Sequence, residues 1–311
     1  MRKNSGPGWK LTQMSSQSQP GSEDGALRAG HIVRTQVIGS PISQSLSPVL
    51  LGAAGLGIKC ERIEIHSGEL HDHMASLEAA GIAGLSVTMP LKQEAFSVCD
   101  TVDDLARQVG AINTIVFRAS PGASDSCITT GYNTDVAGIV AAVREQCGAS
   151  SQFGQGAILG SGATASSALA ALRELGVKRV TVCARRSGGE DTVFAAAKRF
   201  GISLDYCPLE LAAELIGNGR LVISTLPFGV ADVIAAAINA ERMDCSKVTV
   251  LDAAYVPYPS LLTQAVLDHG GMSVPGYEML IHQGLAQAQL FTGQEPNADA
   301  AHQAVTAALG C

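Results

Sequence analysis

The chain has 311 residues with a formal net charge of −7, and 46% of them are hydrophobic while 16% are charged. This length suits two domains. The acidic balance without a basic stripe argues against a nucleic-acid-binding protein, and no run reaches the roughly 18 apolar residues of a membrane helix. Abundant Ala, Val, Leu and Ile, with 34 Gly and few aromatic residues, are typical of an α/β protein.

The cysteines and histidines give no sign of disulfides or of a metal. Eight cysteines are scattered without a C-x-x-C pair, which predicts reduced thiols in a cytoplasmic protein. The seven histidines do not pair with cysteines or acidic residues at metal-ligand spacing, and His71 and His73 fall in a stretch predicted to be an exposed helix, so we expect no metal. Residues 1–30 are rich in Ser, Gly and Gln, and we expect them to form a disordered tail.

The first half alternates strands and helices, with turn signals between them. The predicted order is a strand at 34–39, a helix at 48–56, a strand at 60–66, a helix at 69–80, a strand at 84–90, a helix at 91–107, a strand at 110–118 and a short extended piece that ends near 135. We expect residues 31–135 to form one α/β domain.

The second half has the alternation that is typical of a parallel sheet. A helix is predicted at 136–148, a strand–turn–helix–strand unit follows up to 186, further strands are predicted at 221–227 and 248–255, and the last long helix at 277–291. We expect residues 136–276 to form a doubly wound, Rossmann-type nucleotide-binding domain.

A glycine-rich turn lies between the first strand and the first helix of this second domain. Gly160-Ser161-Gly162-Ala163-Thr164-Ala165 fits G-x-G-x-x-[GA]. The first glycine allows a tight turn and the second lets the backbone approach a pyrophosphate, whose charge the free N–H groups of the helix start can bind. The turn therefore predicts a dinucleotide site that involves Gly160, Gly162, Ala163 and Thr164.

The end of the next strand predicts which dinucleotide binds. NAD-binding folds usually carry an acidic residue there, which accepts from the ribose 2′-hydroxyl. This chain carries Arg185 and Arg186 instead. Guanidinium groups suit a 2′-phosphate through bidentate, charge-assisted hydrogen bonds, so we predict NADP.

Several short polar stretches fall at predicted loops and strand ends. They supply Ser45, Ser47, Thr88, Lys92, Asn113, Asp135 and, far downstream, Gln283. Hydroxyls, amides and an ion pair suit a small polyhydroxylated acid. Lys92 directly follows GLSVTMPL, where a loop begins on a rigid strand.

In these stretches the chain resembles the shikimate dehydrogenase family, from about residue 35 to 305. The resemblance rests on VIGSPISQSLSP, GLSVTMPLK, GAINTIV, GYNTDVAG, AILGSGATA, ISTLP, DAAYVPYPSLL and GYEMLIHQG, in this order. It implies a catalytic pair of Lys92 and Asp135. It also implies a cleft between the two domains, with the C-terminal helices (277–311) returning to complete the first one.

The resemblance implies further site residues as well. Ser45, Ser47, Thr88, Asn113 and Gln283 match the family's contacts to the substrate carboxylate and hydroxyls, and Thr225 of ISTLP belongs to the cofactor side. The chain departs from the common pattern at the turn, which has Ala163-Thr164 where a Gly-Ala pair is common, and at the end of the next strand, which reads A-R-R rather than the frequent N-R-T. In addition, Ser86 stands where Asn is frequent, and Tyr132 where Asp is frequent. Neither belongs to the pair.

The activity that this resemblance implies is the NADP-dependent interconversion of 3-dehydroshikimate and shikimate, a step of aromatic amino-acid and chorismate biosynthesis. One alternative is a quinate or dual quinate/shikimate dehydrogenase that uses NAD. Another is a ligand sensor that has lost its chemistry, which the presence of Lys92 and Asp135 disfavours. Monomer and homodimer both fit the sequence.

Overall fold

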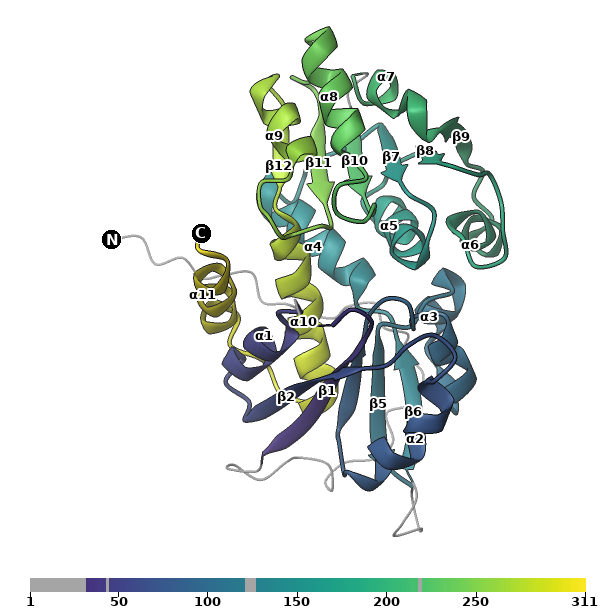
Figure 1. Ribbon diagram of the computed structural model, residues 1–311, viewed down its shortest axis with the longest axis vertical. Helices are drawn as coiled ribbons and strands as arrows, with labels where there is room; N and C mark the ends of the chain where they lie inside the picture. Colours follow the sequence, from purple (N-terminus) through teal and green to yellow (C-terminus); the bar gives the residue numbers. More distant parts are fainter. Residues whose placement is uncertain (1–31, 43–44, 121–126, 218–219) are drawn as a thin grey trace.

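The computed structural model describes residues 32–42, 45–120, 127–217 and 220–311. The tail predicted for residues 1–30 lies outside the described residues. Two six-stranded sheets, one from each half of the chain, stand one above the other with helices between and around them (Figure 1). The predicted α/β class is thus confirmed.

The first sheet is mixed and has the strand order β2-β1-β3-β5-β6-β4. Its strands are β1 (Val33–Gly39), β2 (Ile58–Glu64), β3 (Gly84–Val87), β4 (Thr101–Val102), β5 (Thr114–Ala119) and β6 (Cys127–Tyr132). β1 pairs in parallel with β2 and β3, whereas β5 runs antiparallel to β3 and β6. β1 is almost wholly buried because it lies inside the sheet, whereas β2 is mostly exposed because it forms an edge.

The helix predicted at 91–107 is wrong in its continuity. A 3₁₀ turn, Glu94–Val98, is followed by β4, and only then does α3 (Asp104–Val109) begin. The interruption coincides with the β-branched Val98, Thr101 and Val102, which favour extended backbone. Asp103 then caps α3, because its side chain accepts from the backbone N–H of Leu105 at 2.9 Å.

The second sheet is entirely parallel and has the order β12-β11-β10-β7-β8-β9. Its strands are β7 (Gln155–Leu159), β8 (Arg179–Ala184), β9 (Asp205–Pro208), β10 (Leu221–Ser224), β11 (Thr249–Asp252) and β12 (Met272–Val274). The chain starts in the middle of this sheet, moves to one edge and then returns to build the other. This is the doubly wound order, in which ligands bind where the direction reverses, here between β7 and β10.

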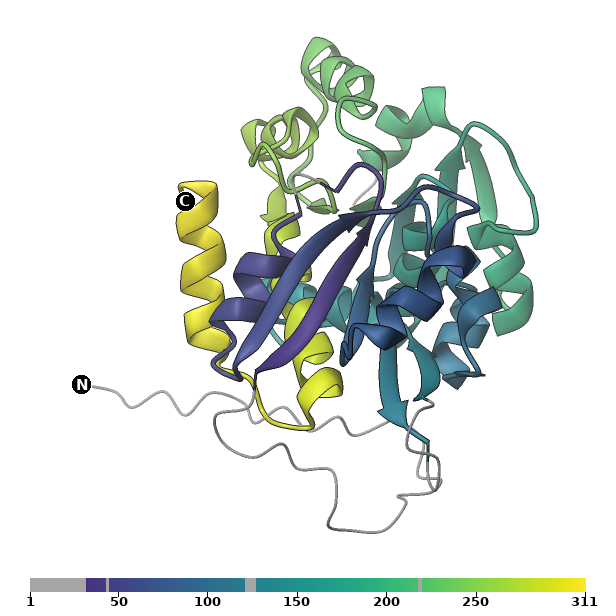
Figure 2. The same ribbon diagram turned by 60° about the horizontal axis from the view of Figure 1, so that its bottom comes forward.

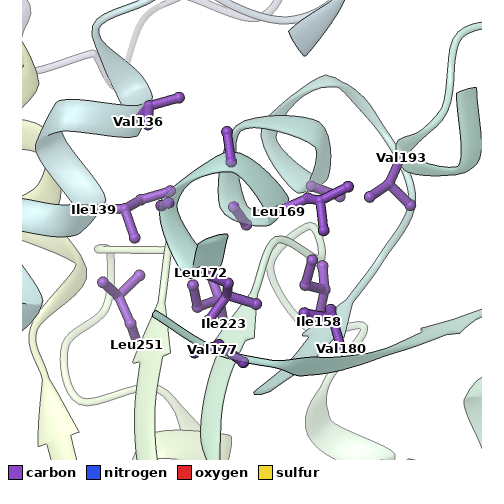
Figure 3. Close-up of a cluster of buried hydrophobic side chains, with 14 of the residues drawn as sticks. Val136, Ile139, Ile158, Leu169, Leu172, Val177, Val180, Val193, Ile223 and Leu251 are labelled. Atoms are coloured by element: carbon purple, nitrogen blue, oxygen red, sulfur yellow. The ribbon is translucent and has the colours of Figure 1, made fainter. Parts of the chain in front are cut away.

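Helices cover both faces of each sheet. On the first sheet, one face carries α2 (Leu70–Ala79) and α3, and the other carries α1 (Ser47–Ala53) with the C-terminal helices. On the second sheet, one face carries α4 (Asp135–Cys147), α5 (Ala163–Glu174) and α6 (Val193–Phe200). Its other face carries α7 (Ala212–Ile216), α8 (Asp232–Glu241) and α9 (Leu261–Asp268). Figure 3 shows the core under α4 and α5, where Leu169 and Leu172 meet Ile158 and Ile223 of the sheet. Burial of such side chains stabilises by roughly 2–3 kcal/mol each.

Two long helices connect the halves. α4 leads from the first sheet to the second, and α10 (Gly276–Thr292) leads back, packed against α4 (Figure 1). Their close approach depends on Gly138, since a Cβ there would lie 2.8 Å from Cβ of Gln283. α11 (Ala298–Leu309) then lies beside α1 (Figure 2). The predicted return of the C-terminal helices to the first sheet is confirmed.

Candidate active site

A cavity of about 360 Å³ lies between the two sheets. Both halves of the chain line it. Among its lining residues are nine of the predicted site residues: Ser45, Ser47, Thr88, Lys92, Asn113, Asp135, Thr164, Thr225 and Gln283. Side chains from four separate stretches of the first half, from the start of α5, from the end of β10 and from α10 therefore meet at one place.

Lys92 is held where the loop after β3 turns back into the fold. Its backbone carbonyl accepts from the N–H of Ile112 at 2.8 Å, which fixes the loop against the start of β5. The side chain is only 11% exposed, and its Nζ lies 2.6 Å from Oδ2 of Asp135. Removing two charges from water is costly, and such a pair adds little to stability. A buried ion pair at the wall of a cavity is therefore a candidate for a functional site.

Asp135 is the first residue of α4 and is 3% exposed. The partial positive charge of the helix start favours its carboxylate. Oδ2 accepts a hydrogen bond from Nζ of Lys92, and Oδ1 accepts one from Nδ2 of Asn113 at 2.7 Å. Both oxygens are thus directed by hydrogen bonds, and the ammonium of Lys92 is held at a defined position at the cavity wall.

Asn113 is the centre of this buried network. Its Oδ1 accepts from the backbone N–H of Thr134 and from Oγ1 of Thr114, both at 2.8 Å. Its Nδ2 also lies 3.2 Å from Oε1 of Gln283 on α10. The amide therefore ties β5, the start of α4 and α10 together. A buried network in which each member is satisfied is rigid.

The hydroxyl side chains form the opposite part of the wall. Oγ of Ser45 donates to Oγ of Ser47 at 3.2 Å, and Ser47 lies at the start of α1. Thr88 follows β3, and its backbone N–H donates to the carbonyl of Ile38 at 2.9 Å. These hydroxyls can donate to and accept from a polyhydroxylated ligand.

Other wall residues come from the second half and were not among the predicted ones. Tyr255 belongs to the loop after β11, and Met279 lies one helical turn before Gln283 on α10. Burial raises the pKa of the Tyr255 phenol, which is a neutral hydrogen-bond donor near pH 7 even at its ordinary pKa. The spacing of Met279 and Gln283 on one helix face was a signal that could have found Met279.

The glycine turn lies beside this cavity at the end of β7. Gly160 has φ +106°, and a Cβ there would stand 2.6 Å from Oγ1 of Thr225. Only glycine permits this conformation without strain. At Gly162 a Cβ would meet nothing within 4 Å, and α5 begins at Ala163 without a side-chain cap. The N–H groups of the helix start therefore face open space, which fits a pyrophosphate.

Arg185 and Arg186 follow β8, the strand next to β7, and both are exposed. They do not line the cavity around Lys92. Their place at the carboxyl end of β8 corresponds to the position that selects the ribose in this fold. Thr164 and Thr225 thus line the same cavity as the Lys92–Asp135 pair. The two arginines lie outside this cavity, at the carboxyl end of the neighbouring strand β8.

Ser86 and Tyr132, which depart from the family pattern, lie at different places relative to the cavity. Ser86 is buried and lines the cavity. Tyr132 lies at the end of β6, where its backbone carbonyl accepts from the N–H of Asn113 at 3.0 Å. Burial raises the pKa of its phenol. Of the two substitutions, only that at Ser86 alters a side chain at the cavity wall.

Known proteins resemble the chain over most of its length. The shikimate dehydrogenase substrate binding domain matches residues 37–115, and the shikimate 5'-dehydrogenase C-terminal domain matches residues 276–306. A curated relative from Acidiphilium cryptum, named shikimate dehydrogenase (NADP(+)), is 32% identical over 91% of this chain and 99% of its own.

Solved structures agree with these matches. The shikimate 5-dehydrogenase of Mycobacterium fortuitum has a TM-score of 0.71 and 34% identity, over 89% of this chain and 99% of its own. That of Thermus thermophilus, solved in complex with NADP(H) and shikimate, has a TM-score of 0.71 and 26% identity, over 89% of this chain and all of its own. The chain belongs to the shikimate dehydrogenase family.

Proposed function

We propose that the protein is an NADP-dependent oxidoreductase that interconverts 3-dehydroshikimate and shikimate. The observation that carries this proposal is the buried pair of Lys92 and Asp135 in a cavity that Thr164 and Thr225 of the nucleotide fold also line. An ion pair held at the junction of a substrate pocket and a dinucleotide turn can supply the proton that the carbonyl oxygen takes up when a hydride is transferred to its carbon. The activity is also the one named for the family's curated members.

Lys92 has the role of proton donor in the reduction direction. The nicotinamide supplies the hydride when it is bound. As the ketone oxygen gains negative charge, the Lys92 ammonium donates a hydrogen bond to it and then a proton. In the reverse direction the neutral amine accepts the proton of the hydroxyl. Because Asp135 holds Nζ at 2.6 Å, little reorientation of the ammonium is needed during the reaction.

Asp135 has two roles at this site. One oxygen balances the charge of Lys92, and the carboxylate can also accept from a substrate hydroxyl that enters the cavity. Asn113 fixes the second oxygen and so prevents the carboxylate from rotating. We assign the remaining hydroxyls and amides, Ser45, Ser47, Thr88 and Gln283, to the carboxylate and ring hydroxyls of the substrate, since they line the same cavity.

The cofactor side follows from the open helix start. Gly160, Gly162, Ala163 and Thr164 would hold the pyrophosphate with backbone N–H groups, and Thr225 lies against the turn. Arg185 and Arg186 would bind the 2′-phosphate, since two exposed guanidinium groups there favour NADP over NAD.

The test is a steady-state absorbance assay of the purified protein with shikimate or quinate, each with NADP or NAD. We expect turnover mainly with shikimate and NADP. Turnover mainly with quinate and NAD would be consistent with the proposed chemistry of Lys92 and Asp135. It would refute the proposal that Arg185 and Arg186 bind the 2′-phosphate of NADP. No turnover of folded protein with any of the four combinations would refute the enzymatic function.

The organisation around this activity is part of the proposal. We assign substrate binding to residues 31–135 with 277–311, and NADP binding to residues 136–276. All eight cysteines are free thiols, and we place the enzyme in the cytoplasm, where thiols stay reduced. Among the described helices, none combines the length and the apolar character that crossing a membrane requires. The partner at the site is a small molecule.

A further inference from the structure

Four potential metal ligands gather where α4, α10 and α11 meet. Glu145 comes from the end of α4, Glu278 and His282 lie one turn apart on α10, and His302 comes from α11. Nε2 of His282 lies 2.8 Å from Oε2 of Glu145, and Nε2 of His302 lies 3.0 Å from Oε1 of Glu278. None of these four residues lines the cavity around Lys92.

The donor set is that of a transition-metal site. Imidazole nitrogen and carboxylate oxygen are common zinc ligands, and a four-residue spacing places Glu278 and His282 on one helix face. Two carboxylates balance the charge of a divalent cation. We propose that Glu145, Glu278 and His282 bind one divalent transition-metal ion of the zinc class, and that His302 orients Glu278 from α11.

The distances are close to those that such an ion needs. One ligand atom each from Glu145, Glu278 and His282 can be chosen so that all three lie within 4.8 Å of one another. His302 does not belong to this group and is joined to it through its hydrogen bond to Glu278. A tetrahedral zinc ion places its ligand atoms about 3.4 Å apart, given bonds of about 2.0–2.1 Å. Glu145 can close the difference by rotating, since its side chain is 66% exposed, whereas His282 is held with 12% exposed. Glu145 and the half-exposed His302 also leave an open path for the ion.

The site would join the helices that connect the two sheets. Asp135 starts the helix that ends beside Glu145, and Gln283 directly follows His282 in the chain. A bound ion would thus hold α4, α10 and α11 together behind the cavity wall that carries Gln283. This role is independent of the proposed activity, because the ion would not touch the substrate cavity.

The test is calorimetric titration of Zn²⁺ into the full chain after chelator treatment and dialysis, at pH 7.5. We expect one equivalent to bind, and thermal unfolding to shift to a higher Tm, since the ion binds the folded state. Co²⁺ should give the visible spectrum of nitrogen and oxygen ligation without the thiolate charge-transfer band, which separates this site from the free cysteines. Zinc bound only with thiolate character would overturn the proposal.

Variants locate the binding. Glu145→Gln and His302→Gln change exposed side chains, so both should fold, and each should weaken Zn²⁺ binding at least tenfold. The first removes a ligand, and the second removes the hydrogen bond that orients Glu278. His71→Gln changes an exposed histidine on α2 and serves as the matched control, with binding unchanged. If the two exposed variants bind Zn²⁺ as the wild type does, or if the wild type binds none, the cluster consists of two ion pairs only and the proposal fails.

Discussion

The two ends of the proposed active site are built differently. At the substrate end, Lys92 and Asp135 are buried and fixed by a network centred on Asn113. At the phosphate end, Arg185 and Arg186 are exposed beyond β8. Proton transfer needs atoms held in place before the reaction, whereas a phosphate can be captured by mobile charges that become ordered on binding. We therefore expect substitutions at the first end to affect turnover and stability, and those at the second to affect cofactor affinity alone.

The largest expected effect is at Lys92. Lys92→Ala should lower kcat about 10³-fold, within the range of a general acid, because no other cation lies against Asp135 among the described residues. The KM for NADP should change little, since Lys92 does not belong to the glycine turn. Steady-state kinetics with shikimate and NADP measure both values.

Lys59→Ala is the matched control for this variant. Lys59 pairs with Glu61 on the edge strand β2 with 66% of its side chain exposed, and its loss should leave kcat unchanged. A Lys92→Ala protein with near wild-type turnover would remove the basis of the proposed chemistry.

The next effect is on stability, at Asn113. Asn113→Ala leaves the backbone N–H of Thr134 and one oxygen of Asp135 without their partner inside the protein. Leaving buried polar groups unsatisfied should lower the free energy of unfolding by about 3 kcal/mol, along with kcat. Urea unfolding measures the change in the free energy of unfolding. An equally stable variant would show that water replaces the amide and that the network is not rigid.

A smaller effect is expected at the phosphate end. Arg185→Ala and Arg186→Ala should each lower kcat/KM for NADP about tenfold through the loss of one charge-assisted contact, and leave NAD kinetics and stability unchanged. Arg179→Ala is the control, because Arg179 lies at the other end of β8 and pairs with Asp205. Equal losses with NADP and NAD would mean that the arginines do not bind the 2′-phosphate.

The fold was predictable where local patterns agree with the topology. The alternation after residue 136 and the turn at Gly160 indicated a doubly wound sheet, and its strand order is the one expected. The helix predicted at 91–107 failed because its apolar spacing continues across Val98–Val102, whereas strand β4 forms there by pairing with β6. A contact to a strand about 30 residues away leaves no signal in the apolar spacing, and the β-branched residues Val98, Thr101 and Val102 were the local sign of an extended segment.

The site was predictable only in part, for a similar reason. The family motifs indicated Lys92, Asp135 and Gln283, and the structure brings them into one cavity. Tyr255 was missed although it lies inside a quoted motif, since only the loop after β11 carries it across to the first half. The four-residue spacing of Glu278 and His282 was a signal against the prediction that no histidine pairs with an acidic residue. No local pattern indicates that Glu145 and His302 lie beside them, because these come from two other helices.

The smallest expected effect concerns the loop that carries Tyr255, and it depends on pH. Asp252 ends β11 and is buried, and it accepts from Oγ of Ser260 at 2.7 Å and from the N–H of Ala254 at 3.3 Å. Burial raises the pKa of this carboxyl above its ordinary 3.8. Between these two pKa values the folded state binds more protons than the unfolded state, so stability falls as pH rises through that window.

Asp252→Asn cannot titrate and should lack this slope. The free energy of unfolding of the wild type minus that of the variant should therefore decrease as pH rises above about 4, and become constant once the folded carboxyl has ionised. Urea unfolding of both proteins at several pH values gives this difference, in which the other titrating groups cancel. A difference that grows with pH would mean that the hydrogen bonds from Ser260 and Ala254 outweigh burial. In that case Asp252 would stabilise the Tyr255 loop as a charged group. The loop would then be held by hydrogen bonds to a buried carboxylate, as the Lys92 side of the cavity is held by those to Asp135.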